Sequence, residues 1–357
     1  MFLNGFQSTT LLKVDVKSYL SNRQQYVSIN GFESSKLDVK CGVPQGSTLG
    51  PLLFLLYIND LNFSLKKSIA SHFADDTCIT YASKKMKSLE TVLNQDLKLT
   101  SDWLKANRLS LNVDKTKLLI FKSKQKRLDN NNFSIKINGS KIEPTDHVKY
   151  LGLYLDKNLS WNAQVNQLTK KLSRSNGILC KLRHLVPKKI IISVYYAIFY
   201  SHLLYGCPVW SLTTENMFNS ITVLQKKCIR IMNFAPFNSH TNDLFADNNI
   251  LKFKDIIQME QIKLVYEYKN NNLPIELNNL FKLNSDVHSH FTRNVANEGL
   301  HIPQIFTTIF GEKSLKYSAA VNWNRFIDQH KGINNFKSVG ALSTYLKNFF
   351  LSVYKDK

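Results

Sequence analysis

The sequence is poor in cysteine and has no cysteine pair at metal-binding spacing. Its five cysteines are spread widely over 357 residues, at Cys41, Cys78, Cys180, Cys207 and Cys228. The lack of C-x-x-C spacing argues against zinc ribbons and knuckles, and the odd number favours reduced thiols inside a cell. No basic stretch followed by an apolar one begins the chain, so no signal peptide is predicted. We therefore expect an intracellular protein, in either the nucleus or the cytoplasm.

Long apolar runs are also lacking. The longest, residues 190–205, is interrupted by Ser193, Ser201 and His202. It falls short of the roughly 18 clean apolar residues that a membrane-spanning helix needs. We read it as a buried helix and expect no membrane partner.

Acidic residues are scarce relative to basic ones. The chain has 26 Asp and Glu against 47 Lys and Arg, a formal net charge of +21. Such an excess predicts a polyanionic partner, nucleic acid first and an acidic membrane surface second. One alternative stays open: 39 Lys and 36 Asn against only 8 Arg are typical of AT-rich coding sequence, so part of the charge can be compositional.

The apolar pattern divides the chain near residue 160. Before this point, strand-like and helix-like segments alternate, with hairpin arms expected at 25–30 and 37–41, a hairpin at 71–81, a buried helix at 52–61, an amphipathic helix at 87–106, and strands at 118–121, 133–137 and 148–155. After it, glycine is sparse and helical patterns dominate, at 163–185, 190–205, 216–233, 253–268 and 339–354. The pattern predicts an α+β protein with two domains, residues 1–160 and a mainly helical 161–357.

Two adjacent carboxylates, Asp75 and Asp76, lie between the apolar arms of the second expected hairpin. Like charges repel and strands seldom contain Asp, so this placement is unfavourable without a compensating group. A divalent cation supplies that compensation, because Mg²⁺ prefers oxygen ligands and leaves room for substrate phosphates. Two such ions stabilise the attacking and leaving oxygens of a phosphoryl transfer. On these residues alone, an ordinary Asp-rich turn stays open as the alternative.

A second feature is the loop Gly42-Val43-Pro44-Gln45-Gly46-Ser47. Its two glycines and its proline allow a tight turn whose backbone approaches a ligand closely. The amide of Gln45 can hydrogen-bond a base edge or a sugar. An ordinary surface turn is the alternative here.

In this order along the chain, the two features resemble the reverse transcriptases of non-LTR retrotransposons, in particular those of jockey-like animal mobile elements. The segments that carry the resemblance are Ser18-Tyr19-Leu20-Ser21-Asn22-Arg23, residues 42–54, Tyr57-Ile58-Asn59-Asp60-Leu61, Phe73-Ala74-Asp75-Asp76, Trp103 with Asn107, Leu109, Leu111-Asn112 and Lys115-Thr116, and Tyr150-Leu151-Gly152 with Asp156 and Leu159-Ser160-Trp161. A looser resemblance to the C-terminal tail of these elements continues through Tyr205-Gly206, Trp210, Gln225-Lys226-Lys227, Ile229-Arg230, Thr292-Arg293 and Trp323-Asn324.

The resemblance implies a polymerase palm in which Gln45, Asp75 and Lys115 face one cleft, and it implies roles for individual residues. Asp75 would bind Mg²⁺ directly, and Asp76 would support the site through a weaker contact. Lys115 would lie near the triphosphate of the incoming nucleotide. The templating base and the nucleotide would be positioned by Pro44, Gln45, Gly46 and Phe73, of which Phe73 replaces the Tyr of many members. The primer end would be held by Tyr150, Leu151 and Gly152.

One motif of the family is missing from the resemblance. The first catalytic motif, an Asp followed by an aromatic-Asp pair, should stand well before Ser18, but the sequence begins at Met1. Asp15, Asp38 and Asp60 lack the context to replace it. We therefore expect a chain truncated before this motif, with an incomplete two-metal site. Loss of one group of a cooperative site removes most of the rate, so impaired catalysis is expected.

Basic residues cluster in two segments. Residues 105–127 hold eight Lys or Arg with one acid, Asp114, and residues 166–189 hold seven with none. The second segment also has helical apolar spacing, which predicts a helix with one buried face and one basic face. A basic face suits the phosphate backbone and gives sequence-independent, salt-sensitive binding. The expected backbone contacts are Lys170, Lys171, Arg174, Lys181 and Arg183; a merely solvated helix face is the alternative.

These observations predict a partial polymerase palm over residues 1–160, followed by a mainly helical thumb and C-terminal region over 161–357. The resemblance implies an RNA-directed DNA polymerase fragment that acts on an RNA template, a DNA primer and deoxynucleoside triphosphates. Two alternatives stay open: a catalytically silent nucleic-acid-binding module, and a translated relic of the element.

Overall fold

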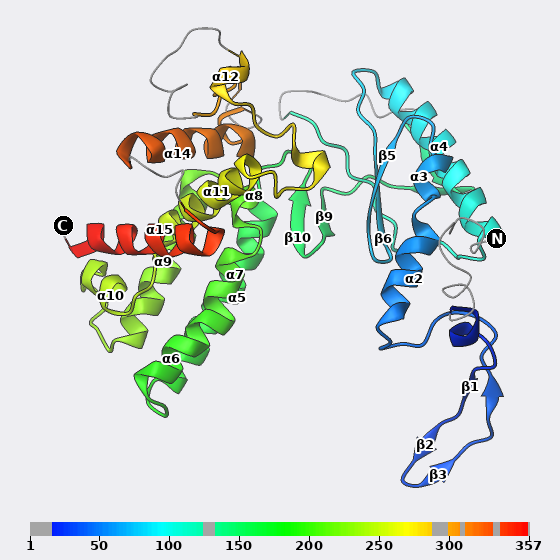
Figure 1. Cartoon of the computed structure of the whole chain (residues 1–357), viewed down its shortest axis with the longest axis horizontal. Coiled ribbons are helices and arrows are strands. Elements are labelled where there is room, and N and C mark those ends of the chain that lie inside the picture. Colours follow the sequence, from blue (N-terminus) through cyan, green and yellow to red (C-terminus); the bar gives the residue numbers. More distant parts are fainter. Residues whose placement is uncertain (1–15, 124–132, 288–298, 308–310, 331–335, 356–357) are drawn as a thin grey trace. The chain divides into compact units, whose positions relative to one another are not determined.

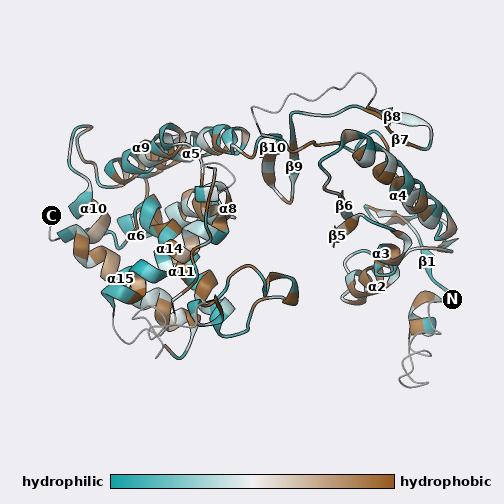
Figure 2. Cartoon of the chain, turned by 90° about the horizontal axis from the view of Figure 1, so that it is seen from above, coloured by the Kyte–Doolittle hydropathy of each residue, from teal (hydrophilic) through white to brown (hydrophobic). Residues whose placement is uncertain are grey.

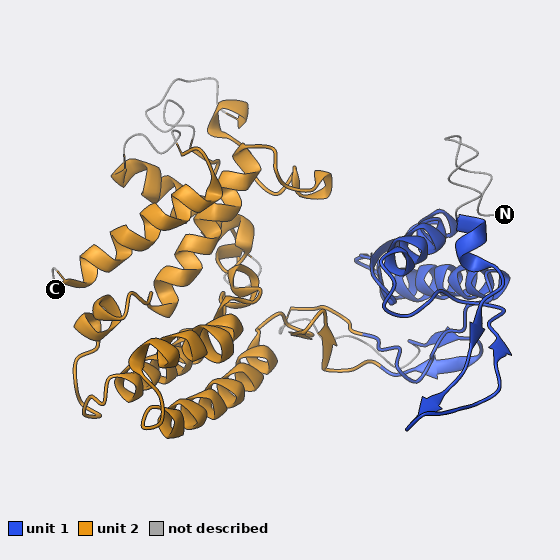
Figure 3. Ribbon diagram, turned by 60° about the horizontal axis from the view of Figure 1, so that its bottom comes forward, with its two compact units in different colours: residues 1–118, 127–143 blue, residues 119–126, 144–357 orange. Residues whose placement is uncertain are grey.

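The chain folds into two compact units, which Figure 3 shows in different colours. The computed structural model describes residues 16–123, 133–287, 299–307, 311–330 and 336–355. Unit 1 comprises residues 1–118 and 127–143, and unit 2 comprises residues 119–126 and 144–357. The architecture is α+β, mostly helical with small antiparallel hairpins (Figure 1). The domain boundary expected near residue 160 stays a prediction.

Unit 1 combines helices with four two-stranded pairings among its described residues. Residues 16–20 are helical, and the helices that follow are α2 (Leu49–Ile58), α3 (Leu61–Ser64) and α4 (Met86–Ala106). The strands are β1 (Gln24–Gln25), β2 (Ser28–Ile29), β3 (Phe32–Glu33), β4 (Leu37–Asp38), β5 (Ile69–Phe73), β6 (Asp76–Thr80), β7 (Ile135–Ile137) and β8 (Ser140–Ile142). Antiparallel pairing joins β1 with β4, β2 with β3, β5 with β6, and β7 with β8. Both expected hairpins are confirmed, and the first turns at Asn30 and Gly31, which both have positive φ.

Helix α2 is present but is not the buried helix that its sequence predicts. Its ten residues, LGPLLFLLYI, contain no polar face, yet only Gly50 and Ile58 are buried. The side chains of Leu52 and Leu55 are 53% and 49% exposed. The prediction was wrong because the described residues of unit 1 pack against only one side of this helix. An apolar composition predicts that a helix needs a cover, but it does not identify the covering segment.

The small core of unit 1 lies around α4. This helix is amphipathic, as predicted, and packs against α3 and β7. Among the described residues of unit 1, the buried apolar side chains are Ile58, Leu61, Val92, Ile135, Ile137 and Ile142.

Unit 2 is a helical assembly preceded by one hairpin. The hairpin consists of β9 (His147–Tyr150) and β10 (Leu153–Asp156). The helices are α5 (Asn162–Leu182), α6 (Lys188–Tyr195), the π-helix η2 (Tyr196–Tyr200), α7 (Ser201–Leu204), α8 (Cys207–Trp210), α9 (Glu215–Met232), α10 (Asn242–Asp247), α11 (Phe253–Lys269), the 3-10 helix η3 (Ile275–Leu277), α12 (Asn284–Val287), α14 (Leu315–Gln329) and α15 (Val339–Lys355). The five helices expected after residue 160 are confirmed, and the structure adds α8, α10, η3, α12 and α14.

Two expected strands were wrong. Residues 148–155 form a hairpin instead of one strand, because Leu151 and Gly152 both adopt positive φ and reverse the chain. The apolar alternation continues through this turn and conceals it. Residues 118–121, although described, form no strand.

The core of unit 2 is large and is built from helix faces. Helix α5 packs against α9, and α11 packs against α14 and α15. Hydrophobic and hydrophilic residues alternate around α5, α9 and α15 (Figure 2). Trp210 and Phe253 stack at the centre with ring centroids 5.6 Å apart. The buried amide of Gln225 donates to Leu251 O at 2.9 Å and accepts from Phe253 N at 2.7 Å, so its polar atoms are paired.

None of the described helices is long and apolar enough to cross a membrane.

Candidate functional site

Asp75 and Asp76 lie at the tip of the β5–β6 hairpin. Phe73 pairs with Asp76, so the turn consists of Ala74 and Asp75 alone. Ala74 has a φ of 51°, a left-handed conformation that is uncommon for a residue with a Cβ. Both aspartates and Phe73 are exposed, and neither carboxylate has a hydrogen bond or ion pair among the described residues. These oxygens are therefore available to an external cation.

A buried carboxylate fixes the start of the strand that carries this tip. Asp96 of α4 is fully buried and accepts hydrogen bonds from the backbone N–H groups of Lys66, Lys67 and Ser68 at 3.1, 3.2 and 2.8 Å. Burial favours the protonated acid, but these N–H groups outweigh it and hold the pKa of Asp96 below its ordinary value. Asp96 thus anchors the turn immediately before β5. Sequence reasoning missed it, although its position on the Val92–Thr100 stripe of α4 was a signal.

The hairpin is also tied to α3. The ring of His72 contacts Thr77 Oγ1 at 3.1 Å through Nδ1 and Asn62 Oδ1 at 3.3 Å through Nε2. Burial lowers the pKa of His72, which favours the neutral ring in this role. His72 is therefore a positioning residue for the tip.

The Gln45 loop is a tight turn that opens α2. Ser47 N donates to Pro44 O at 3.4 Å, and Ser47 Oγ donates to the same oxygen at 2.8 Å. Gly46 has a φ of 80°, which glycine adopts readily at this turn position. The turn leaves Gln45 exposed at its corner.

Lys115 lies on a turn after α4. The side-chain oxygen of Asn112 accepts from Lys115 N at 3.1 Å, and the lysine is exposed. Tyr57 of α2 donates its hydroxyl to Asn107 O at the end of α4, which joins the helix after the Gln45 loop to the segment before Lys115. Unit 1 therefore contains the Gln45 loop, the carboxylate hairpin and the Lys115 turn. That Gln45, Asp75 and Lys115 face one cleft stays a prediction.

The described residues contain no group of three or more His, Cys, Asp or Glu arranged to hold a metal ion. The candidate metal ligands are therefore the two carboxylates of Asp75 and Asp76. Two carboxylates suit a hard cation such as Mg²⁺, which takes its remaining ligands from water and substrate phosphates.

In unit 2, the β9–β10 tip is held by an aromatic residue that follows α7. Tyr205 donates its hydroxyl to Leu151 O. Gly152 has a φ of 82°, and a Cβ there would lie 3.3 Å from the Tyr205 ring. The positive φ and the close approach of the Tyr205 ring therefore both favour glycine at position 152. The Tyr205-Gly206 segment was noted in the sequence, but its contact with the hairpin was not expected.

The segment after β10 has a structural role. The carboxylate of Asp156 accepts from Asn158 N at 3.1 Å and Ser160 N at 2.9 Å, and Ser160 Oγ also donates to it. These bonds shape the turn that leads into α5. Asp156 therefore fixes the path from the hairpin to the basic helix.

The basic residues of α5 divide into two stripes and one structural arginine. Lys170, Arg174 and Lys181 share an exposed stripe, while Lys171 lies on the neighbouring one. Arg183 donates from Nη1 to Ile231 O at 3.2 Å and lies over the Phe234 ring, 4.6 Å from its centroid. The guanidinium of Arg183 thus joins the end of α5 to the end of α9.

The segment around α5, residues 157–214, carries charged side chains of positive sign only. No Asp or Glu occurs between Asp156 and Glu215, whereas this interval contains eight Lys or Arg. Several noted residues, among them Asp15, Arg127 and Thr292-Arg293, lie outside the described residues.

Comparison with known families gives a match over the first part of the chain. Residues 4–155 match the family described as reverse transcriptase (RNA-dependent DNA polymerase). This range includes the Gln45 loop, the β5–β6 hairpin and the Lys115 turn.

Curated relatives extend the similarity into unit 2. The RNA-directed DNA polymerase from mobile element jockey of Drosophila melanogaster is 25% identical over 311 residues, which is 82% of this chain and 33% of that protein. The probable RNA-directed DNA polymerase from transposon X-element of the same species is 28% identical over 239 residues, 65% of this chain and 26% of that protein. The corresponding protein from transposon BS is 27% identical over 248 residues, 66% of this chain and 27% of that protein. The chain spans about a third or less of the length of these relatives.

Proposed function

Because this chain is a distant homologue of the reverse transcriptases of jockey-like non-LTR retrotransposons, we propose that it takes part in template-directed nucleotidyl transfer. In this proposal unit 1 carries the chemistry and unit 2 holds the nucleic acid. The observation that carries the proposal is the pair of carboxylates, free among the described residues, at a two-residue hairpin tip within the matched range. The partners are an RNA template, a DNA primer and deoxynucleoside triphosphates.

The proposed roles follow the exposed groups of unit 1. Asp75 and Asp76 hold Mg²⁺, which, when bound, neutralises charge that develops on the transferred phosphoryl group. The exposed ammonium of Lys115 lies near the triphosphate. The template base and nucleotide are positioned by Pro44, Gln45, Gly46 and Phe73. In unit 2, the primer end is held by Tyr150, Leu151 and Gly152.

We further propose that these 357 residues by themselves are impaired in catalysis. Asp75 and Asp76 are neighbours on one hairpin, so they cannot surround two ions at once. A two-metal mechanism needs anionic ligands that hold both ions at a fixed separation. Loss of one member of such a cooperative site removes most of the rate.

Primer extension tests the proposal. The chain alone should show little or no extension with Mg²⁺ and deoxynucleotides. A chimera that adds the first catalytic motif of a jockey-like relative should extend the primer, and Asp75→Ala in the chimera should abolish extension. Asp102→Ala, at an exposed acid on α4, is the matched control and should retain it. Extension by the chimera that survives Asp75→Ala would refute the metal role of the hairpin.

A nucleic-acid-binding role without catalysis is the second candidate. Between Asp156 and Glu215 the chain has eight basic residues and no acid, which favours this candidate. Binding of a phosphate backbone by these residues does not depend on the carboxylates of the unit 1 hairpin. A chimera that binds template-primer duplex but never extends it would favour this candidate.

A further inference from the structure

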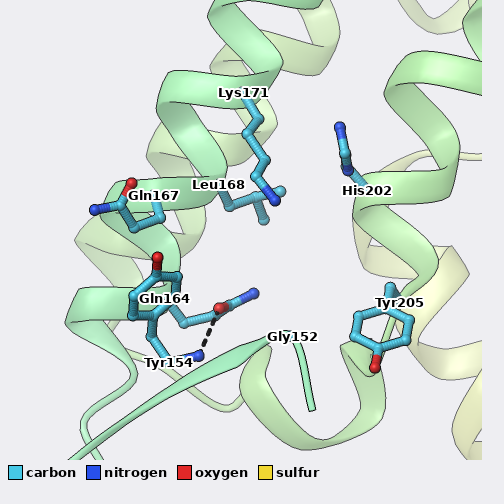
Figure 4. Close-up of a pocket in the computed structure, with 8 residues that line it drawn as sticks. All are labelled: Gly152, Tyr154, Gln164, Gln167, Leu168, Lys171, His202 and Tyr205. Atoms are coloured by element: carbon cyan, nitrogen blue, oxygen red, sulfur yellow. Dashed lines mark hydrogen bonds between the residues drawn. The ribbon is translucent and has the colours of Figure 1, made fainter. Parts of the chain in front are cut away.

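A cavity of about 80 Å³ lies beside the β9–β10 hairpin, between α5 and the segment around α7. Its walls include Gly152 and Tyr154 of the hairpin, Gln164 and Lys171 of α5, and His202 and Tyr205 (Figure 4). All of these residues belong to unit 2. The cavity is therefore a feature of one compact unit.

The orientation of Gln164 makes it a donor to this cavity. Its side-chain oxygen accepts from Tyr154 N at 3.0 Å, as the dashed line in Figure 4 shows. An amide whose oxygen is bound in this way must direct its NH₂ group to the other side. Figure 4 shows that nitrogen facing the open space. Gln164 is buried, so its position is fixed by packing as well.

A cation and an imidazole complete the walls. The ammonium of Lys171 enters the space from α5, and the His202 ring stands opposite (Figure 4). Neither side chain has a hydrogen bond or ion pair among the residues that the structure describes. Burial, and then the charge of Lys171, lower the pKa of His202, which favours the neutral ring.

No acidic residue lines the cavity. The sequence-adjacent acid, Asp156, already accepts hydrogen bonds from Asn158 and Ser160. The walls thus present an ammonium, an amide NH₂ and a neutral imidazole with no negative charge to balance them. Such a set of donors is complementary to an anion.

We propose that this cavity binds one phosphate group of a nucleic-acid backbone. Its volume of about 80 Å³ accommodates a single phosphate group. The neighbouring stripe of Lys170 and Arg174 continues along α5, where further phosphates of the same strand would contact it. The identification of the polymer rests on the proposed function, whereas the anion preference rests on the cavity itself.

This assignment separates Lys171 from the other basic residues of α5. Lys170, Arg174 and Lys181 share the neighbouring stripe and do not line the cavity, whereas Lys171 does. Lys171 shares its phosphate with Gln164, a neutral donor that no count of charges would reveal. Because Tyr205 forms part of the wall and bonds the hairpin tip, the bound phosphate lies next to the residues proposed to hold the primer end.

Binding of a labelled RNA–DNA duplex, measured by fluorescence anisotropy over a series of salt concentrations, tests the proposal. Lys171→Gln should weaken binding about 5-fold at 0.1 M salt and reduce the salt slope by about 1, the effect of losing one phosphate contact. Gln164→Glu keeps the acceptor for Tyr154 N but places a carboxylate in the cavity, so it should weaken binding by about 10-fold or more. Lys254→Gln, at an exposed lysine of α11, is the charge-matched control and should change affinity less than 2-fold.

Two further arms identify the source of the phosphate. A duplex with a neutral methylphosphonate at the contacted position should bind wild type and Lys171→Gln equally. Pyrophosphate should bind only weakly and should not displace the duplex at equal concentration. If pyrophosphate binds tightly and depends on Lys171 and Gln164, the cavity holds a free phosphate and the backbone assignment is wrong.

The failures of the two proposals are distinguishable. If the duplex binds and both cavity variants behave like Lys254→Gln, the cavity proposal is wrong while the proposed function stands. If no variant or wild-type protein binds duplex, the proposed function fails. Matching thermal unfolding curves for Gln164→Glu and wild type will show that its loss of binding does not arise from misfolding.

Discussion

The two units differ in how much of their apolar surface they bury. Among the described residues, unit 2 buries 36 apolar side chains in one cluster, whereas unit 1 buries six. Unit 1 instead exposes much of an apolar helix, α2, and two carboxylates with no partner among its described residues. Unit 2 therefore has the means to hold its shape by itself. Unit 1 has only a small core around α4, and its exposed groups are available to ligands or to other chain segments.

The units also differ in charge. The 58-residue interval between Asp156 and Glu215 in unit 2 has no acid, while the chemically distinctive groups of unit 1 are two acids. Binding of the nucleic-acid backbone and binding of metal cations are thus assigned to different parts of the molecule. The predictions below test this division.

The largest expected effect is on duplex binding. Replacement of Lys170, Lys171 and Arg174 by Glu should weaken binding of template-primer duplex by about 100-fold or more at 0.1 M salt and flatten the salt slope, because three phosphate contacts become repulsive. The matched reversal in unit 1 is Lys84, Lys85 and Lys87 to Glu, at three exposed lysines. It should change affinity far less. Equal losses from both sets would mean that the charge is compositional.

Core truncations should affect the units unequally. Leu172→Ala, at a fully buried position of α5, should lower the free energy of unfolding by about 2–5 kcal/mol. Leu55→Ala on the exposed face of α2 should lower it by about 0.5 kcal/mol or less. Denaturant unfolding followed by tryptophan emission reports on both units, because Trp103 lies in unit 1 and the other three tryptophans lie in unit 2. Comparable losses at both positions would contradict the picture of α2 as an uncovered helix.

Local sequence signals predicted the parts of the fold that depend on neighbouring residues. The hairpin at Asp75, the tight turn at Gln45 and the long helices of unit 2 follow from short-range patterns and were confirmed. The exposure of α2 did not follow, because a pattern of apolar residues does not show which segment covers them. The β9–β10 turn was missed because Leu151 is an apolar residue in a turn conformation that usually selects Gly or Asn.

The groups that position the candidate sites depend on long-range contacts. Asp96 meets the backbone of Lys66 to Ser68, about thirty residues earlier in the chain. Gln164 and His202 line one cavity only because α5 and α7 pack side by side. Neither arrangement has a spacing that a sequence pattern records.

Loss of the Asp96 anchor should disturb unit 1 alone. Asp96→Asn replaces one of the acceptor oxygens with an NH₂ group, which faces backbone N–H donors and cannot accept from them. We expect a local destabilisation of about 1–3 kcal/mol, the cost of unpaired buried polar groups. Amide exchange of β5 and β6 should quicken, while that of α5 and α9 should not change. Asp102→Asn on the exposed side of α4 should have no such effect.

A smaller, pH-dependent effect is expected in unit 2. Burial raises the pKa of Asp255 against the opposing hydrogen bond from Tyr354 and the charges of Lys252 and Lys254. Because the folded pKa lies above the unfolded one, the contribution of this group to stability is full below the ordinary carboxyl pKa and is lost as pH rises through the folded pKa. Asp255→Asn should remove this dependence, so its Tm relative to wild type should rise as pH increases from about 4 to 7. A Tm difference that does not change with pH would contradict the assignment.

The most direct test of the division between the units is a pair of variants in the active chimera. The single-turnover extension rate at saturating duplex and the duplex Kd should be measured for Asp75→Ala and Lys171→Gln. The account predicts that Asp75→Ala abolishes extension and leaves the duplex Kd unchanged, while Lys171→Gln raises the Kd and leaves the saturated rate unchanged. Two results would contradict this division: Asp75→Ala weakens duplex binding but retains the extension rate, or Lys171→Gln lowers the extension rate at saturating duplex. Either would mean that catalysis and duplex binding are not divided between the units as proposed.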